Sequence, residues 1–190
     1  MKLHSIVERI MMLVGKSDCQ KNKKTEYHDE KKRDYLRDEG GEPIIWYKGM
    51  PKSRLDEGGI SCIEFGAYFC DNEFAADTYS SEGFVLRAYI SVSDPFIIDA
   101  KKSRWNEIPW DCNTSDKRDY KRFKQYRDKY LKQKGGKPEK EFSTDLLVRF
   151  IMAETSHDAV IICNVYEGGQ ASKWLITDIV VWDNTCLEIL

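Results

Sequence analysis

The sequence predicts an α+β fold. Segments with the character of strands outnumber segments with helical spacing, and the two kinds do not alternate strictly along the chain. The 190 residues suffice for one domain with a sizeable core, and no apolar run is long enough to span a membrane. We therefore expect a core domain over residues 44–190, preceded by a distinct region at residues 1–43.

The N-terminal region is expected to have two parts. Residues 3–14 place apolar side chains at helical spacing, which predicts an amphipathic helix packed on the domain. Residues 16–42 carry eight basic and eight acidic side chains, few of which can be buried. We interpret this tract as a solvated helix or flexible linker that ends at Gly40 and Gly41.

The first half of the core domain is predicted to hold several strands and one short helix. Residues 44–49 are apolar or aromatic up to a glycine, which is typical of a buried strand that ends at a close main-chain contact. Residues 65–69 are extended, and Asp71 or Asn72 can cap a short helix that ends near residues 75–79. Residues 84–92 alternate as a strand, which Asp94 and Pro95 interrupt, and residues 96–100 are again extended.

Residues 101–141 have an unusual composition, with fourteen basic and seven acidic side chains. Within them, Tyr120, Phe123, Tyr130 and Leu131 lie on one face of a predicted helix. One interpretation is a basic surface for nucleic acid or an acidic partner. The interpretation we favour is a helical insertion that docks through its aromatic face and leaves its lysines in water, because acidic residues are mixed in.

The last third of the chain is predicted to be one helix followed by two strands. Ser143 or Thr144 caps a helix that runs to about residue 154, with its apolar side chains facing inward. Residues 159–163 form a buried strand, residues 164–172 a loop, and residues 173–182 a long alternating strand.

Charge and motifs exclude several classes of function. The net charge of −2 provides no general attraction to nucleic acid or membranes. The six cysteines form no C-x-x-C pair, the three histidines are scattered, and neither a P-loop nor a G-x-G-x-x-G motif is present. We therefore expect no metal site. Because residues 1–15 lack the features of a secretion signal, we also expect a cytoplasmic protein with reduced cysteines.

Two tyrosines suggest a binding slot. Tyr68 and Tyr79 are separated by a predicted strand, turn and helix, which can bring their rings face to face. Such a slot suits a planar heteroaromatic ligand. Taken alone, these residues are better explained as two tyrosines of the core.

Four segments in a fixed order resemble a known family. They are residues 47–49 (Tyr-Lys-Gly), 66–69 (Gly-Ala-Tyr-Phe), 94–100 (Asp-Pro-Phe-Ile-Ile-Asp-Ala) and 157–165 (His-Asp-Ala-Val-Ile-Ile-Cys-Asn-Val). Together they resemble the ADP-ribosyltransferase domains of phage and mobile-element polyvalent proteins, which are distant relatives of the poly(ADP-ribose) polymerases. The likeness covers about residues 44–190, and residues 1–43 and most of 109–141 lie outside it. It implies split antiparallel β-sheets with flanking helices and NAD⁺ in the cleft between them.

The resemblance also implies roles for individual residues. The main chain of Gly49 would hold the nicotinamide amide, and Tyr68 and Tyr79 would enclose the nicotinamide ring, next to Phe69. Tyr47 stands where many relatives have a histidine or arginine that faces the ribose or phosphate.

Three polar residues complete the expected site. Asn164 ends a strand near the presumed cleft, although asparagine more commonly caps a turn. Glu167 lies in the loop where such enzymes recognise their targets. The family's catalytic acid, usually a glutamate, corresponds to Asp178 in the segment Thr177–Asp183, where it would stabilise an oxocarbenium-like transition state. The other interpretation of Asp178 is a surface position on an alternating strand.

Three functions follow from this resemblance. The first is an NAD⁺-dependent mono-ADP-ribosyltransferase of the phage, mobile-element or effector type, which modifies a protein of the host in preference to a nucleic acid. The second is an NAD⁺ glycohydrolase toxin. The third is a non-catalytic protein that binds a partner through the basic insertion; the absence of a charged residue at Tyr47 and the short acid at Asp178 favour it.

Overall fold

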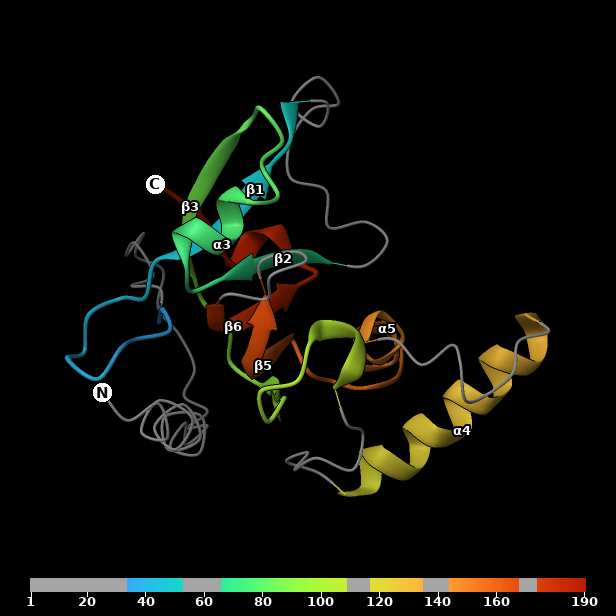
Figure 1. Ribbon diagram of the computed structural model, residues 1–190. Coiled ribbons are helices and arrows are strands. Elements are labelled where there is room, and N and C mark those ends of the chain that lie inside the picture. Colours follow the sequence, from blue (N-terminus) through green and yellow to red (C-terminus); the bar gives the residue numbers. More distant parts are fainter. Residues whose placement is uncertain (1–33, 53–65, 109–116, 135–143, 168–173) are drawn as a thin grey trace, which may run out of the picture.

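The computed structural model describes residues 34–52, 66–108, 117–134, 144–167 and 174–190 (Figure 1). The described residues form one seven-stranded sheet in the order β4-β5-β6-β2-β1-β3-β7. Its strands are β1 (Trp46–Met50), β2 (Ala67–Cys70), β3 (Phe84–Ile90), β4 (Pro95–Asp99), β5 (Ala159–Glu167), β6 (Trp174–Val181) and β7 (Leu187–Ile189). The helices are α3 (Glu73–Asp77), α4 (Lys117–Lys134) and α5 (Thr144–Glu154), with 3₁₀ turns η1 (Trp105–Glu107) and η3 (Asn184–Cys186). The predicted α+β class is confirmed.

The sheet consists of two halves joined at a narrow point. Strands β4, β5, β6 and β2 form one half, and β1, β3 and β7 form the other. Only one register pair, Tyr47 with Cys70, joins β1 to β2, whereas five pairs join β1 to β3 and four join β2 to β6. Because this junction is so short, the two halves can diverge on either side of it and leave room between them.

The expectation of purely antiparallel pairing is wrong at one edge. Strands β4 and β5 pair in parallel, from Pro95 opposite Ala159 to Asp99 opposite Cys163. A parallel pair needs a long crossover connection, and the segment that contains η1, α4 and α5 supplies it.

Strand alternation separates two cores on opposite faces of the sheet. On β2, Tyr68 and Cys70 belong to the core that α3, α4 and α5 cover. Ala67 and Phe69 belong to the other core, which also contains Trp46. The candidate site therefore draws most of its side chains from the helix-covered face.

The helix α4 docks on α5 through aromatic rings. Phe123 is buried, and its ring centre lies 5.2 Å from that of Phe150; Tyr126 lies 5.4 Å from the same ring. The side chains of Tyr120 and Leu131, which were predicted to share this face, lie outside the described residues.

The core domain extends further towards the N-terminus than residue 44. The main-chain N–H of Leu36 donates to the carbonyl of Ile90 at 3.0 Å, and Ile44 donates back to Leu36 at 2.8 Å. Leu36 and Ile44 pack on the core formed around Trp46. Residues 34–43 are therefore a turn held against β3 and not a solvated helix, while the predicted helix at residues 3–14 lies outside the described residues.

The short helix α3 is capped as predicted by one of the two candidates. The Asn72 side chain accepts a hydrogen bond from the N–H of Ala75 at 3.0 Å. Asp71 instead accepts from the N–H of Thr177 at 3.0 Å, which ties the end of β2 to β6. In the described part of the chain, no helix is both long and apolar enough to cross a membrane.

Candidate functional site

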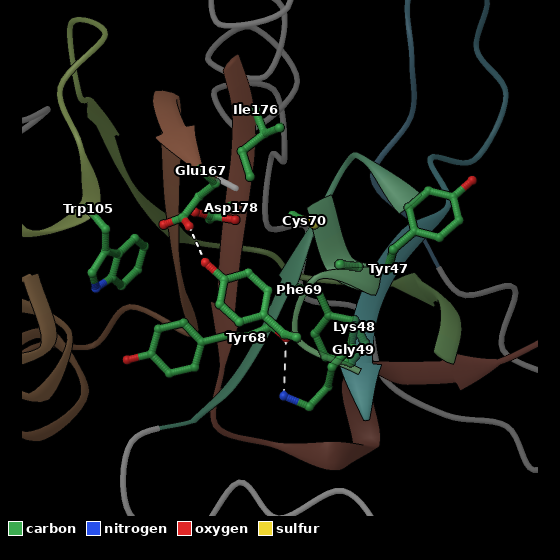
Figure 2. Close-up of a pocket in the computed structure, with 12 residues that line it drawn as sticks. Tyr47, Lys48, Gly49, Tyr68, Phe69, Cys70, Trp105, Glu167, Ile176 and Asp178 are labelled. Atoms are coloured by element: carbon green, nitrogen blue, oxygen red, sulfur yellow. Dashed lines mark hydrogen bonds between the residues drawn. The ribbon is translucent and has the colours of Figure 1, made fainter. Parts of the chain in front are cut away.

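A pocket of about 330 Å³ lies where the two halves of the sheet meet (Figure 2). Seven of the eight predicted site residues line it: Tyr47, Gly49, Tyr68, Phe69, Tyr79, Glu167 and Asp178. They come from β1, β2, β5, β6 and the end of α3, and they span more than 130 positions of the sequence. The fold thus brings these distant residues together around one cavity.

Asn164 is the predicted site residue that the structure places elsewhere. It adopts a left-handed conformation with φ of 57°, at an irregularity of β5 between Ile162 and Val165. Its amide donates to the Asp99 carboxylate at 2.9 Å. Asparagine tolerates this backbone conformation, so Asn164 shapes the bulge and does not line the pocket.

Close packing explains the glycine at position 49. A Cβ atom at this position would lie 2.2 Å from the carbonyl oxygen of Ala76 and 2.9 Å from the Cβ of Tyr79. The absence of a side chain therefore lets the end of α3 rest on β1. This contact brings Tyr79 to the edge of the pocket.

Tyr79 and Glu167 form a direct contact across the pocket. The Tyr79 hydroxyl donates to Oε2 of Glu167, although 88 positions separate the two residues (Figure 2). Burial, followed by this hydrogen bond, raises the pKa of Tyr79 above its usual range. The hydroxyl is therefore protonated at physiological pH and acts as a hydrogen-bond donor.

Tyr68 forms another wall of the pocket together with Trp105. Their ring centres are 5.4 Å apart in an edge-to-face arrangement. The Tyr68 hydroxyl and the Trp105 indole N–H both donate to Oδ1 of Asp145, at 3.3 and 3.4 Å. Asp145 lies in the first turn of α5, so this helix positions both rings.

Asp178 is the buried carboxyl of the pocket. It is 8% exposed, although it belongs to a strand whose other residues, apart from Thr177, are apolar. No described residue donates a hydrogen bond to its carboxyl group. Burial is the largest cause that raises its pKa well above the usual range, and repulsion from Glu167 and Asp71 adds to it. The interpretation of Asp178 as a surface position is wrong, because β2 and β5 flank β6 on both sides.

Cys70 lies opposite Asp178 on the neighbouring strand. Its thiol donates to the carbonyl of Asn72 at 3.2 Å, and burial raises its pKa to about 12. A thiol with this pKa is protonated at neutral pH and is a poor nucleophile.

The predicted residues differ in how they face the pocket. The ring of Phe69 packs in the opposite core, and the Lys48 ammonium lies 5.8 Å from its centre. The Tyr47 ring extends away from the two carboxylates, whereas Glu167 and Asp178 lie close together (Figure 2). Phe69 thus supports the pocket from behind, and Tyr47 borders its far side.

The sequence analysis missed two pocket residues with polar groups. Lys48 donates to the main-chain carbonyl of Tyr68 at 3.3 Å, and its position between two predicted residues could have indicated it. Trp105 belongs to a segment that the family resemblance covers, but no local pattern directs its ring to the pocket.

Comparison with protein-family models, curated proteins and solved structures found no match to this chain. In the parts of the chain that the structure describes, no cluster of His, Cys, Asp and Glu could hold a metal ion.

Proposed function

We propose that this protein is an NAD⁺-dependent mono-ADP-ribosyltransferase that binds NAD⁺ in the pocket between the two halves of the sheet. One observation carries the proposal. The pocket brings together two tyrosines, the main chain of a glycine and a buried carboxyl, which the sequence resemblance had selected from separate segments.

The aromatic wall supports binding of the nicotinamide ring. Tyr68 and Tyr79 both line the cavity, and the hydrogen bonds to Asp145 and Glu167 restrict the positions of their rings. The main chain of Gly49 lies at the same pocket, where an N–H and a carbonyl suit a carboxamide. A volume of about 330 Å³ is at the small end of ligand pockets, so it would hold the nicotinamide end of NAD⁺ and leave the adenosine end outside.

The carboxyl groups support the chemistry. Cleavage of the bond between ribose C1 and nicotinamide develops positive charge on the ribose, and a nearby carboxylate stabilises that charge. Burial raises the pKa of Asp178 well above its usual range, which favours the neutral form of its carboxyl group. The positive charge of the nicotinamide ring would favour the ionised form, so we expect NAD⁺ binding to release a proton from Asp178.

Glu167 supplies a second acid at the edge of the pocket. It lies at the end of β5 and accepts a hydrogen bond from the Tyr79 hydroxyl. This bond connects the ring of Tyr79 to the two carboxyl groups of the pocket, those of Glu167 and Asp178. We propose that Asp178 acts on the reacting ribose. Glu167 holds Tyr79 in place and faces the side of the pocket where the acceptor would bind.

The proposal is tested by incubating the protein with NAD⁺ labelled in its adenylate part, with and without cell lysate. Free nicotinamide and label on macromolecules are measured together. Transfer of label to a protein supports the proposal. Release of nicotinamide without a labelled macromolecule would show that the protein is an NAD⁺ glycohydrolase and not a transferase. If neither nicotinamide nor labelled product is detected, the protein is a non-catalytic binding protein.

Two substitutions connect the activity to the pocket. Asp178→Asn is expected to bind NAD⁺ and lose turnover, and Tyr79→Ala is expected to lose NAD⁺ binding. The controls are Asp34→Asn, at an exposed carboxylate, and Tyr89→Ala, at a tyrosine that pairs with Tyr35 outside the pocket. Binding is measured as thermal stabilisation, which amounts to roughly 2.7 kcal/mol at a ligand concentration one hundred times Kd. Full turnover by Asp178→Asn would exclude Asp178 from the mechanism.

A further inference from the structure

The helix α4 concentrates positive charge. Its 18 residues include nine lysines and arginines and two aspartates, which gives a net charge of +7. Since the whole chain carries −2, the remainder carries −9. The molecule is therefore strongly polarised, with one basic helix and an acidic body that repels anions.

Four lysines of α4 face away from the core. Phe123 is buried against α5, while Lys121, Lys124, Lys129 and Lys132 are exposed. At 3.6 residues per turn, Lys121 and Lys132 lie opposite Phe123 with the other two lysines on either flank. From Lys121 to Lys132 the helix rises about 16 Å. Figure 1 shows that α4 extends outward from the rest of the molecule.

The composition of this surface favours a nucleic acid over a protein partner. Protein interfaces are enriched in aromatic residues and depleted in lysine at their centres. Among the described residues, none of the exposed large hydrophobic side chains lies on α4; they are Phe74, Tyr79, Phe84, Ile189 and Leu190. A surface of lysines without an apolar centre suits a partner whose charge is regularly spaced, as in a phosphate backbone.

The same surface favours a duplex over a single strand. Proteins that bind single strands stack bases on exposed aromatic rings. The described aromatic rings of α4 instead pack against the core that contains Phe150. The major groove of B-DNA is wide enough to admit an α-helix, whereas the major groove of an RNA duplex is narrow.

We propose that the outward lysines of α4 bind the phosphate backbone of double-stranded DNA without sequence preference. This binding does not depend on NAD⁺ or on the pocket. It would attach the protein to DNA while the acidic remainder of the chain stays away from the phosphates.

The test is fluorescence anisotropy of a labelled DNA duplex with the full chain, repeated over a range of salt concentrations. If the four lysines each contact one phosphate, the slope of log K against log salt is about −3.6. The double variant Lys121→Glu, Lys132→Glu is expected to halve this slope to about −1.8 and to weaken binding at low salt by at least tenfold.

A matched control separates the α4 surface from general charge. Lys101→Glu with Lys102→Glu makes the same change in net charge in an exposed turn after β4, and it is expected to leave the slope unchanged. Circular dichroism and the thermal midpoint verify that both double variants are folded. Asp178→Asn is expected to bind DNA like the wild type, which distinguishes this proposal from the NAD⁺ proposal.

Four outcomes would overturn the proposal. The first two are that the protein does not bind the DNA duplex at low salt, and that the α4 and control variants lose binding equally. The third is that the protein binds a single strand or an RNA duplex more tightly than the DNA duplex. The fourth is that it binds polyglutamate as tightly as the DNA duplex or more tightly. The last result would identify an acidic protein as the partner.

Discussion

Replacement of Asp178 by asparagine should make the protein more stable at neutral pH but not in acid. Asp178 is 8% exposed, and its carboxyl accepts no hydrogen bond from any described residue. Burial therefore raises its pKa, and the negative charges of Glu167 and Asp71 raise it further. Asparagine has nearly the same shape as a protonated aspartate but never carries the charge.

The size of the effect follows from proton linkage. Below about pH 4, the ordinary pKa of aspartate, Asp178 is protonated in both the folded and the unfolded chain, and it makes no pH-dependent contribution. Above that pH the unfolded chain loses the proton and the folded chain retains it. The free energy of unfolding of the wild type then falls by about 1.4 kcal/mol per pH unit until the pKa of the folded state is reached.

The assay is urea unfolding of both proteins at one-unit steps from about pH 4 to about pH 8. The difference in unfolding free energy should grow by about 1.4 kcal/mol per unit in favour of Asp178→Asn and then become constant. Asp71, whose pKa burial also raises, is present in both proteins, so its contribution cancels. Asp34→Asn should follow the wild type. A difference between Asp178→Asn and wild type that stays constant across this range would refute the raised pKa of Asp178.

Three further predictions concern the walls of the pocket. Gly49→Ala should reduce the free energy of unfolding by about 1–3 kcal/mol, because its Cβ would meet the carbonyl of Ala76 at 2.2 Å; an unchanged urea midpoint would contradict this packing. The thiol of Cys70, with its pKa raised to about 12, should resist alkylation at neutral pH in the native protein and react in urea, which mass spectrometry of the labelled peptide detects. Asp145→Ala removes the hydrogen-bond acceptor of the Trp105 indole. Since a hydrogen bond contributes about 1 kcal/mol, this change should weaken NAD⁺ binding about fivefold in a thermal-shift titration. Unchanged affinity would show that this hydrogen bond does not position the Trp105 ring for binding.

The local elements of the fold could be predicted from neighbouring residues. The Asn72 cap and the strands at the end of the chain depend on patterns that repeat within a few positions. The alternation of β2 likewise determines that Tyr68 and Cys70 share a face, whichever strands lie beside them. Such patterns are local because hydrogen bonds within a turn and strand periodicity involve residues close in sequence.

The pairing of distant segments could not be predicted in the same way. The parallel alignment of β4 with β5 depends on the crossover through η1, α4 and α5, which returns the chain to the same end of the sheet. Asn164 was expected near the cleft, but a bulge turns its amide to Asp99. The fold also includes residues 34–43, because the carbonyl of Ile90 in β3 accepts the N–H of Leu36, a contact that the charge pattern of this tract does not reveal.

For the site, the sequence pattern was enough to select candidate residues, but their arrangement around the pocket depends on the fold. Gly49, Tyr79 and Asp178 were selected from separate segments. The contact of Tyr79 with Glu167, the shared acceptor of Tyr68 and Trp105, and the burial of Asp178 between two strands exist only in the folded chain. The physical reason is that the pKa of a carboxyl and the position of a ring depend on neighbours in space, and here those neighbours come from strands that are far apart in the sequence.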